Sequence, residues 1–163
     1  MSFAQDSDKA LGFDKARDYA FRLLKFRMRS RQELRSRLKK KKFDPATIER
    51  VVDFLAQRKF LDDREFARAW VRERIKRPFG VVRISRELKL KGIDKNIISD
   101  TLADLGSDYD EVAVVAELAK ARSARLSGLE PKKAKARLYA YLLRRGFSTD
   151  AILEAIKQSG TEK

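Results

Sequence analysis

FDPATI at residues 43–48 is the first of three similar segments, and its pattern recurs as IDKNII at 93–98 and FSTDAI at 147–152. Each segment has an apolar residue, then Asp or Ser, and an isoleucine five positions after the first residue. Asp and Ser are favoured N-cap residues, and apolar residues that flank a cap form a hydrophobic staple. The segments start 50 and 54 residues apart, so the sequence predicts a tandem array of helical units.

The spacing of apolar residues around these segments predicts the fold class. A leucine lies five positions before each segment and another aliphatic residue lies nine before it, which suits one face of a preceding helix. We therefore expect an all-α protein of three tandem three-helix, helix-turn-helix-like repeats, forming an elongated, curved array of right-handed bundles. The predicted parts are a flexible N-terminal tail (1–13), three repeats (14–61, 62–107 and 108–158) and a C-terminal tail (159–163).

Capping boxes mark further helix starts at Ser30-x-x-Glu33, Asp62-x-x-Glu65 and Asp108-x-x-Glu111. The neighbouring carboxylates of Asp62 and Asp63 could also suggest a metal or acid–base site, but a capping role explains them better. In the third repeat we expect a longer first helix, running towards Leu126, to account for the wider spacing of 54 residues.

The composition excludes several classes of function. The 163 residues include no cysteine and no histidine, which removes thiolate chemistry, disulfides and imidazole ligands. No apolar run approaches the length of a membrane span, and the first residues lack the pattern of a signal peptide. We find no catalytic constellation, metal site or cofactor motif, and we expect a cytoplasmic protein that is not an enzyme.

Positive charge is concentrated in the chain. The net charge is +15, and the windows 22–42, 68–91 and 120–145 hold 29 of the 39 basic residues but only 4 of the 24 acids. Solvated helix surfaces are usually charged, which is the alternative explanation. However, such surfaces usually mix both signs, whereas Arg31, Arg35, Lys39 and Lys42 would form a same-sign stripe opposite the buried leucines. The pattern indicates a surface that binds a polyanion, such as nucleic acid, or an acidic protein.

Two aromatic pairs have competing interpretations. Phe66 and Trp70 could stack on nucleic-acid bases, but their place on an amphipathic helix favours a role in the core. Tyr139 and Tyr141 cannot both face inward, so contact between one of them and a base or a partner stays open.

The central part of the chain resembles the RecX family of regulators. The resemblance spans about residues 16–158 and is weakest in the third repeat. The segment from Leu24 to Leu38 is similar to the family's first repeat. The central motif consists of FLDDREFA at 60–67, Trp70, Arg74, GVVRI at 80–84 and ELKLKGI at 87–93.

The resemblance implies a small cytoplasmic modulator of the RecA recombinase in DNA recombination, repair and the SOS response, built from three three-helix repeats. It implies binding along the groove of the RecA–single-stranded DNA filament and inhibition of filament growth, strand exchange and ATP hydrolysis. We expect a monomer with no cofactor and no membrane partner, and double-stranded DNA is a further candidate ligand. The side chains expected to bind the filament or its DNA are Arg27, Arg31, Arg35, Lys39, Arg74, Lys76, Arg77, Arg83, Lys91, Lys132, Arg137 and Arg144.

The competing hypothesis is a general nucleic-acid-binding helical repeat protein or a helix-turn-helix-type regulator. A sequence-specific reader needs Asn, Gln or Arg aimed at base edges. The second helix of each predicted repeat is instead rich in Lys and Arg, which suits phosphates better than bases.

Overall fold

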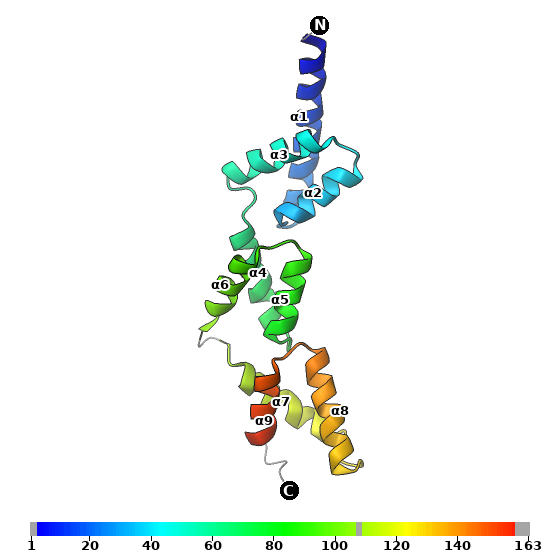
Figure 1. The fold of residues 1–163 in the computed structure, drawn as a ribbon, viewed down its shortest axis with the longest axis vertical. Coiled ribbons are helices and arrows are strands. Elements are labelled where there is room, and N and C mark those ends of the chain that lie inside the picture. The colour runs from blue at the N-terminus through cyan, green and yellow to red at the C-terminus, as the bar shows by residue number, and fades with distance from the viewer. Residues whose placement is uncertain (1–2, 107–108, 159–163) are drawn as a thin grey trace. The chain divides into compact units, whose positions relative to one another are not determined.

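The computed structural model describes residues 3–106 and 109–158, and its side chains from residue 11 to residue 157 outside that gap. Within these ranges the chain forms nine α-helices and no strand (Figure 1), which confirms the all-α prediction. The helices are α1 (Phe3–Phe26), α2 (Arg31–Lys40), α3 (Pro45–Gln57), α4 (Asp63–Ile75), α5 (Val81–Leu90), α6 (Lys95–Ala103), α7 (Glu111–Ser123), α8 (Pro131–Arg144) and α9 (Thr149–Gln158).

The three recurring segments begin α3, α6 and α9, as predicted. In each, the side chain of the capping residue accepts a hydrogen bond from a backbone N–H in the first turn. The bonds join Thr47 N to Asp44 Oδ1 (3.0 Å), Asn96 N to Asp94 Oδ1 (2.8 Å) and Ala151 N to Ser148 Oγ (3.2 Å). The isoleucine of each segment is buried: Ile48, Ile98 and Ile152.

Three helix bounds differ from the expectation. Helix α1 begins at Phe3 rather than at residue 14, so it includes most of the predicted N-terminal tail. The predicted boundaries between the repeats and the tails stay a prediction. Asp108 lies outside the described residues, and the N-cap of α7 is Asp110, whose Oδ1 accepts from Ala113 N at 3.0 Å.

The prediction of a longer first helix in the third repeat is wrong, because α4 and α7 both have 13 residues. The added residues lie instead in the α7–α8 connection and in α8, which has 14 residues against 10 in α5.

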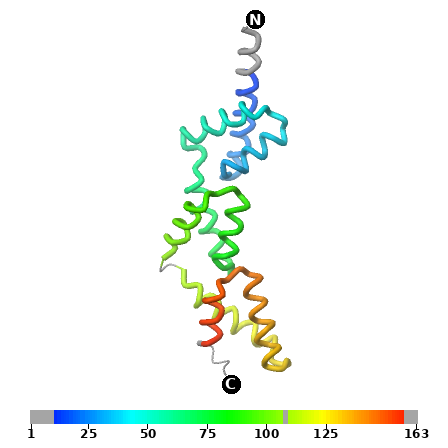
Figure 2. Tube along the Cα trace, in the orientation of Figure 1, coloured from blue at the N-terminus to red at the C-terminus, as the bar shows by residue number. Residues whose placement is uncertain are grey.

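The chain forms two compact units, each with its own core. The first unit comprises the residues up to Arg68 and Lys89–Ile97, and the second comprises Ala69–Leu88 and the residues from Ile98 onward. The trace in Figure 2 lets the reader follow both units along the chain. The first core contains Ala16 and Ala20 of α1, Leu34 and Leu38 of α2, and Val51, Val52 and Leu55 of α3. The second contains Val115 and Ala119 of α7, Leu138 and Leu142 of α8, and Ala151, Ile152 and Ala155 of α9.

In the first unit, the N-terminus of α2 is bound by residues from further along the chain. The Ser30 hydroxyl donates to the Lys91 carbonyl at 2.6 Å, and the Arg31 N–H donates to Asp63 Oδ1 at 2.9 Å. Lys91 lies in the turn after α5, and Asp63 is the first residue of α4. The start of α2 is therefore joined both to the turn after the next repeat's second helix and to its first helix.

The second unit contains the same junction at equivalent positions. The Gly80 N–H donates to the Arg145 carbonyl at 3.1 Å, and the Val81 N–H donates to Glu111 Oε1 at 2.8 Å. Gly80 follows Ser30 by 50 residues and Arg145 follows Lys91 by 54 residues, which are the two spacings of the sequence repeat. Glu111 Oε2 also accepts from the Ser148 hydroxyl at 2.6 Å, so one carboxylate joins the first turns of three helices.

Helix α8 does not repeat this arrangement. The residues that correspond to Gly80 and Val81, 54 positions later, are Ala134 and Lys135, and both lie inside the helix. The Ala134 N–H is bonded within α8, to the Glu130 carbonyl at 2.9 Å.

Two glycines allow the backbone to pass closely at the second junction. Gly146 has a φ of 79°, a conformation that favours glycine, and a Cβ there would overlap the backbone of Arg83. A Cβ on Gly80 would overlap the Gly146 carbonyl and the Phe147 Cα. Backbone atoms cannot yield as a flexible side chain does, so both positions are sterically restricted.

We predict that Gly80→Ala lowers the free energy of unfolding by about 1–3 kcal/mol, the usual cost of overpacking. Gly128→Ala is the matched control, because nothing lies within 4 Å of a Cβ at Gly128. Urea denaturation followed by circular dichroism measures both variants. Equal stability of the two would contradict the close approach at this junction.

Candidate nucleic-acid interface

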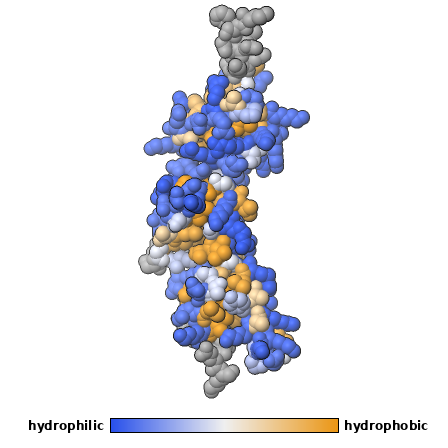
Figure 3. Space-filling model, viewed as in Figure 1, coloured by the Kyte–Doolittle hydropathy of each residue, from blue (hydrophilic) through white to orange (hydrophobic). Residues whose placement is uncertain are grey.

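The twelve predicted binding side chains differ in how far they reach solvent. Arg31, Arg35, Arg74, Arg83 and Lys91 are half-buried. The exposed ones are Arg27, Lys39, Lys76, Arg77, Lys132, Arg137 and Arg144. Hydrophilic side chains cover most of the visible face around α1–α3 (Figure 3). The binding role of all twelve stays a prediction.

Six of the twelve are held by carboxylates, which the sequence analysis missed. The pairs are Arg27–Glu33, Lys91–Glu33, Arg35–Glu49, Arg74–Glu87, Arg83–Glu87 and Lys76–Glu73. Four acids, Glu33, Glu49, Glu73 and Glu87, thus neutralise part of the positive charge of these side chains.

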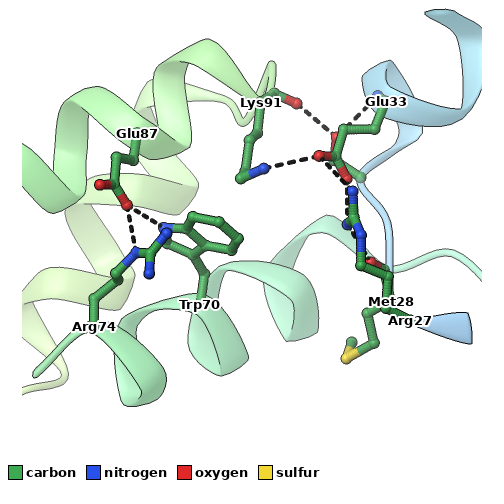
Figure 4. Close-up of polar contacts among 8 residues, drawn as sticks. Arg27, Met28, Glu33, Trp70, Arg74, Glu87 and Lys91 are labelled. Atoms are coloured by element: carbon green, nitrogen blue, oxygen red, sulfur yellow. Dashed lines mark hydrogen bonds and ion pairs between the residues drawn. The ribbon is translucent and has the colours of Figure 1, made fainter. Parts of the chain in front are cut away.

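Glu33 is the centre of the cluster in the first unit (Figure 4). Arg27 donates to both of its carboxylate oxygens, at 2.9 and 3.2 Å, and Lys91 Nζ donates to Oε1 at 2.8 Å. Burial alone would raise the pKa of Glu33, but the hydrogen bonds from Arg27 and Lys91 outweigh burial and bring its pKa down to about 2. The predicted capping box is therefore only half formed: Ser30 caps the Glu33 N–H, while the Glu33 side chain binds the two cations.

Glu87 is the centre of a similar cluster in the second unit (Figure 4). Its carboxylate accepts from Arg74 Nε at 2.6 Å, Arg83 Nε at 3.1 Å and Trp70 Nε1 at 3.0 Å. Burial opposes the charged form, but the hydrogen bonds from these cations keep the pKa of Glu87 below its ordinary value. The Arg74 guanidinium also lies 4.3 Å from the centroid of the Trp70 ring.

The predicted same-sign stripe on α2 is wrong for Arg35. The Arg35 guanidinium binds both oxygens of Glu49 on α3, with Nε–Oε1 and Nη2–Oε2 distances of 2.9 and 2.8 Å. A bidentate pair of this kind fixes the side chain against α3. Arg35 is therefore bound to α3 within the first repeat.

The other six predicted side chains form no ion pair within the part of the chain that the structure describes. They are Arg31, Lys39, Arg77, Lys132, Arg137 and Arg144. Three of them lie on α8, in the third repeat. These are the cations of the set best able to bind an external anion.

The structure shows how far each of the four aromatic residues is buried, and so which of them can stack on a base. Phe66 is buried and cannot stack on a base, whereas Trp70 is half-buried and held by Glu87. The guanidinium groups of Arg122 and Arg145 lie 4.9 and 5.1 Å from the centroid of the Tyr141 ring, and both Tyr139 and Tyr141 are half-buried. A binding role for the tyrosines stays untested.

Two further basic residues and an exposed aromatic lie outside the predicted set. Arg29 and Arg37 line a cavity together with Arg27 and Lys91. Phe26, at the end of α1, is 84% exposed, which is unusual for a phenylalanine. The signal that could have identified them is the dense basic run at 22–42.

Comparison with protein families matches three domain models in order along the chain. They are the RecX first three-helix domain at residues 16–55, the second at 62–102 and the third at 108–156. This chain belongs to the RecX family. The tandem repeats predicted from the sequence are therefore confirmed as RecX three-helix domains.

Relatives of this RecX-family chain are named as regulatory proteins. The regulatory protein RecX of Bacillus licheniformis is 40% identical over 158 residues, which are 95% of this chain and 57% of that relative. The chain thus spans little more than half of that relative's length. The regulatory protein RecX of Chlorobium phaeobacteroides is 39% identical over 145 residues, covering 88% of this chain and 93% of the relative.

Solved structures share the fold. A crystal structure of RecX from Lactobacillus salivarius matches with a TM-score of 0.83 at 25% identity, covering 91% of this chain and 97% of that one. A second crystal structure, of a regulatory protein RecX, matches with a TM-score of 0.85 at 21% identity over 96% of this chain and 78% of its own. None of the helices in the described ranges combines the length and apolar composition needed to cross a membrane.

We predict that Glu33→Gln destabilises the protein by about 1.5–3 kcal/mol at pH 7, the usual range for hydrogen bonds to a charged group. The pKa of Glu33 is lower in the folded protein than its ordinary 4.5. Its contribution is therefore complete above about pH 4.5 and is lost as the pH falls towards 2. The difference between wild type and variant should shrink over that interval.

Urea denaturation at pH 7, 5 and 3 measures this effect. Glu49→Gln is the control, because the exposed Glu49 pair should contribute less than about 1 kcal/mol. A Glu33→Gln deficit that stays constant from pH 7 to pH 3 would show that the carboxylate is not responsible.

Proposed function

We propose that this protein binds the RecA–single-stranded DNA filament and modulates it, mainly by inhibiting filament growth, strand exchange and ATP hydrolysis. The observation that carries the proposal is the match of all three RecX domains, in order, along one chain. The partners proposed are RecA and single-stranded DNA, with double-stranded DNA as a further ligand. The protein would act as a cytoplasmic monomer.

The charge distribution supports a nucleoprotein target. The chain carries a net charge of +15, and four of its acids hold six of the predicted cations in place. The cations without an internal partner, above all those of α8, can then release counterions from a nucleic-acid backbone. A target that combines DNA phosphates with protein acids suits such a surface.

The repeats suggest how weak contacts could add up to regulation. Each repeat presents its own cations, and contacts made together on one chain raise avidity without a deep pocket. A protein that binds one arrangement of the filament better than another shifts the equilibrium by the difference in binding free energy. Inhibition follows if the preferred arrangement is one that cannot add further RecA subunits.

The structure offers an argument against the competing helix-turn-helix mode of DNA reading. Recognition helices contact base edges with their N-terminal residues. The N-terminus of α2 is bonded to Lys91 and Asp63, and that of α5 is bonded to Arg145 and Glu111. Both helix starts are therefore occupied within the repeat array.

The test adds the purified protein to RecA filaments on single-stranded DNA and follows ATP turnover and filament length. We expect both to fall as the protein is added. No effect at several-fold excess over RecA subunits would overturn the proposal.

We predict that the α8 triple variant Lys132→Gln/Arg137→Gln/Arg144→Gln needs about ten times more protein for half-inhibition, because each lost cation removes a salt-dependent contact. The matched control is Lys15→Gln/Lys95→Gln/Lys157→Gln, which removes the same charge from exposed positions outside the proposed set. Circular dichroism and melting temperature check that both variants stay folded. Equal inhibition by the two triple variants would show that net charge, rather than α8, is what matters.

A further inference from the structure

We propose that a cavity in the first unit, between the end of α1 and the turn after α5, binds one phosphate group of a single-stranded DNA backbone. The choice of DNA as the source of this phosphate rests on the proposed function. The lining includes Arg27, Arg29, Arg37 and Lys91, with the neutral donors Gln32 and Ser36.

The size of the cavity suits a single phosphate group. Its volume is about 150 Å³, roughly ten times the ~10–15 Å³ that a cavity needs to hold one water molecule. Sites for drug-sized ligands are usually at least about 300 Å³. The cavity can therefore hold a compact oxyanion with its hydration, but it cannot enclose a whole nucleotide.

The charge inside the cavity is not balanced by the protein. Four cationic side chains line it with a single carboxylate, that of Glu33. Arg27 and Lys91 are both engaged with Glu33, as the dashed contacts in Figure 4 show. The lining therefore keeps a net charge of +3, and its two other cations, Arg29 and Arg37, form no ion pair within the described residues.

Arg29 and Arg37 supply the donors that an anion needs. Within the described residues, the hydrogen bond of the Arg29 side chain is a long one, from Nε to the Leu23 carbonyl at 3.5 Å. Arg37 has no carboxylate partner in the same part of the chain. Guanidinium groups bind phosphate through paired N–H donors, which gives direction as well as charge.

Electrostatic repulsion around Arg29 supports the same assignment. Burial lowers the pKa of the Arg29 guanidinium and the charge of Arg27 lowers it further, while the Glu33 charge opposes this effect and Arg37 adds to it. A bound anion would offset that repulsion.

The surroundings favour DNA over an acidic protein segment as the source of the anion. Phe26 is 84% exposed and immediately precedes Arg27, and Leu90 on the cavity lining is 82% exposed. Proteins that bind single strands commonly pair a cationic groove with exposed aromatic rings on which bases stack. A base next to the bound phosphate can stack on Phe26, a contact that a chain of acidic side chains cannot make.

The experiment measures binding of labelled (dT)15 to the full chain by fluorescence anisotropy, without RecA, over a range of salt concentrations. Arg29→Gln/Arg37→Gln should weaken binding at low salt by about tenfold. The slope of log K against log salt should fall in magnitude by about 0.7, the value for one phosphate contact on a single strand. The melting temperature of the variant should match or exceed that of wild type, because repulsion is removed.

The control is Lys15→Gln/Lys95→Gln, which removes two charges from exposed positions outside the cavity. It should weaken binding less than about threefold and leave the salt slope unchanged. If both double variants lose affinity equally, the effect is one of net charge and the assignment is overturned.

A poly-glutamate peptide tests the alternative ligand class. If Arg29→Gln/Arg37→Gln loses poly-glutamate binding but keeps wild-type binding to (dT)15, the cavity binds carboxylates and the proposal is overturned. Unchanged binding to both ligands overturns it as well. Because RecA is absent from these measurements, a failure here is distinct from a failure of wild type to act on the filament.

Discussion

The repeat array depends on one recurring interaction: a carboxylate at the first residue of a helix accepts the N–H that begins a helix of the preceding repeat. Asp63 does this for Arg31 and Glu111 does it for Val81. A helix start leaves backbone donors without partners, and here an anion from the next repeat satisfies one of them. Because each repeat of about 50 residues offers few large apolar residues, stability has to be shared between neighbours. The hydrogen bonds of the junction are the specific contacts through which neighbouring repeats share their stability.

Carboxylates also divide the basic residues into two groups. Glu33, Glu49 and Glu87 hold arginines and a lysine that would otherwise repel one another, and the cations without such partners remain for ligands. The net charge of +15 is therefore a poor guide to the local attraction of anions. This attraction is weaker than the net charge suggests where carboxylates pair with the cations, and stronger where they do not. The cavity lined by Arg29 and Arg37 is the clearest case of charge that the protein does not neutralise.

Sequence reasoning succeeded where the signal was local. The caps at Asp44, Asp94 and Ser148 and the buried isoleucines depend on residues within one helical turn, so spacing alone revealed them. It failed where partners are distant, since Lys91 and Glu33 lie 58 positions apart and meet only in the folded protein. The Glu33 capping box failed for the same reason, because a long-range ion pair outweighed a local hydrogen bond. The longer α7 was wrong because added residues can extend a loop or a later helix equally well.

The extra turn of α8 limits how the repeats can be combined. Ala134 stands where Gly80 stands one repeat earlier, yet its N–H is already committed within its own helix. A further repeat could not attach there by the bonds that join the first three. The contacts that fasten α2 and α5 to the repeats after them thus have no counterpart at this position of α8.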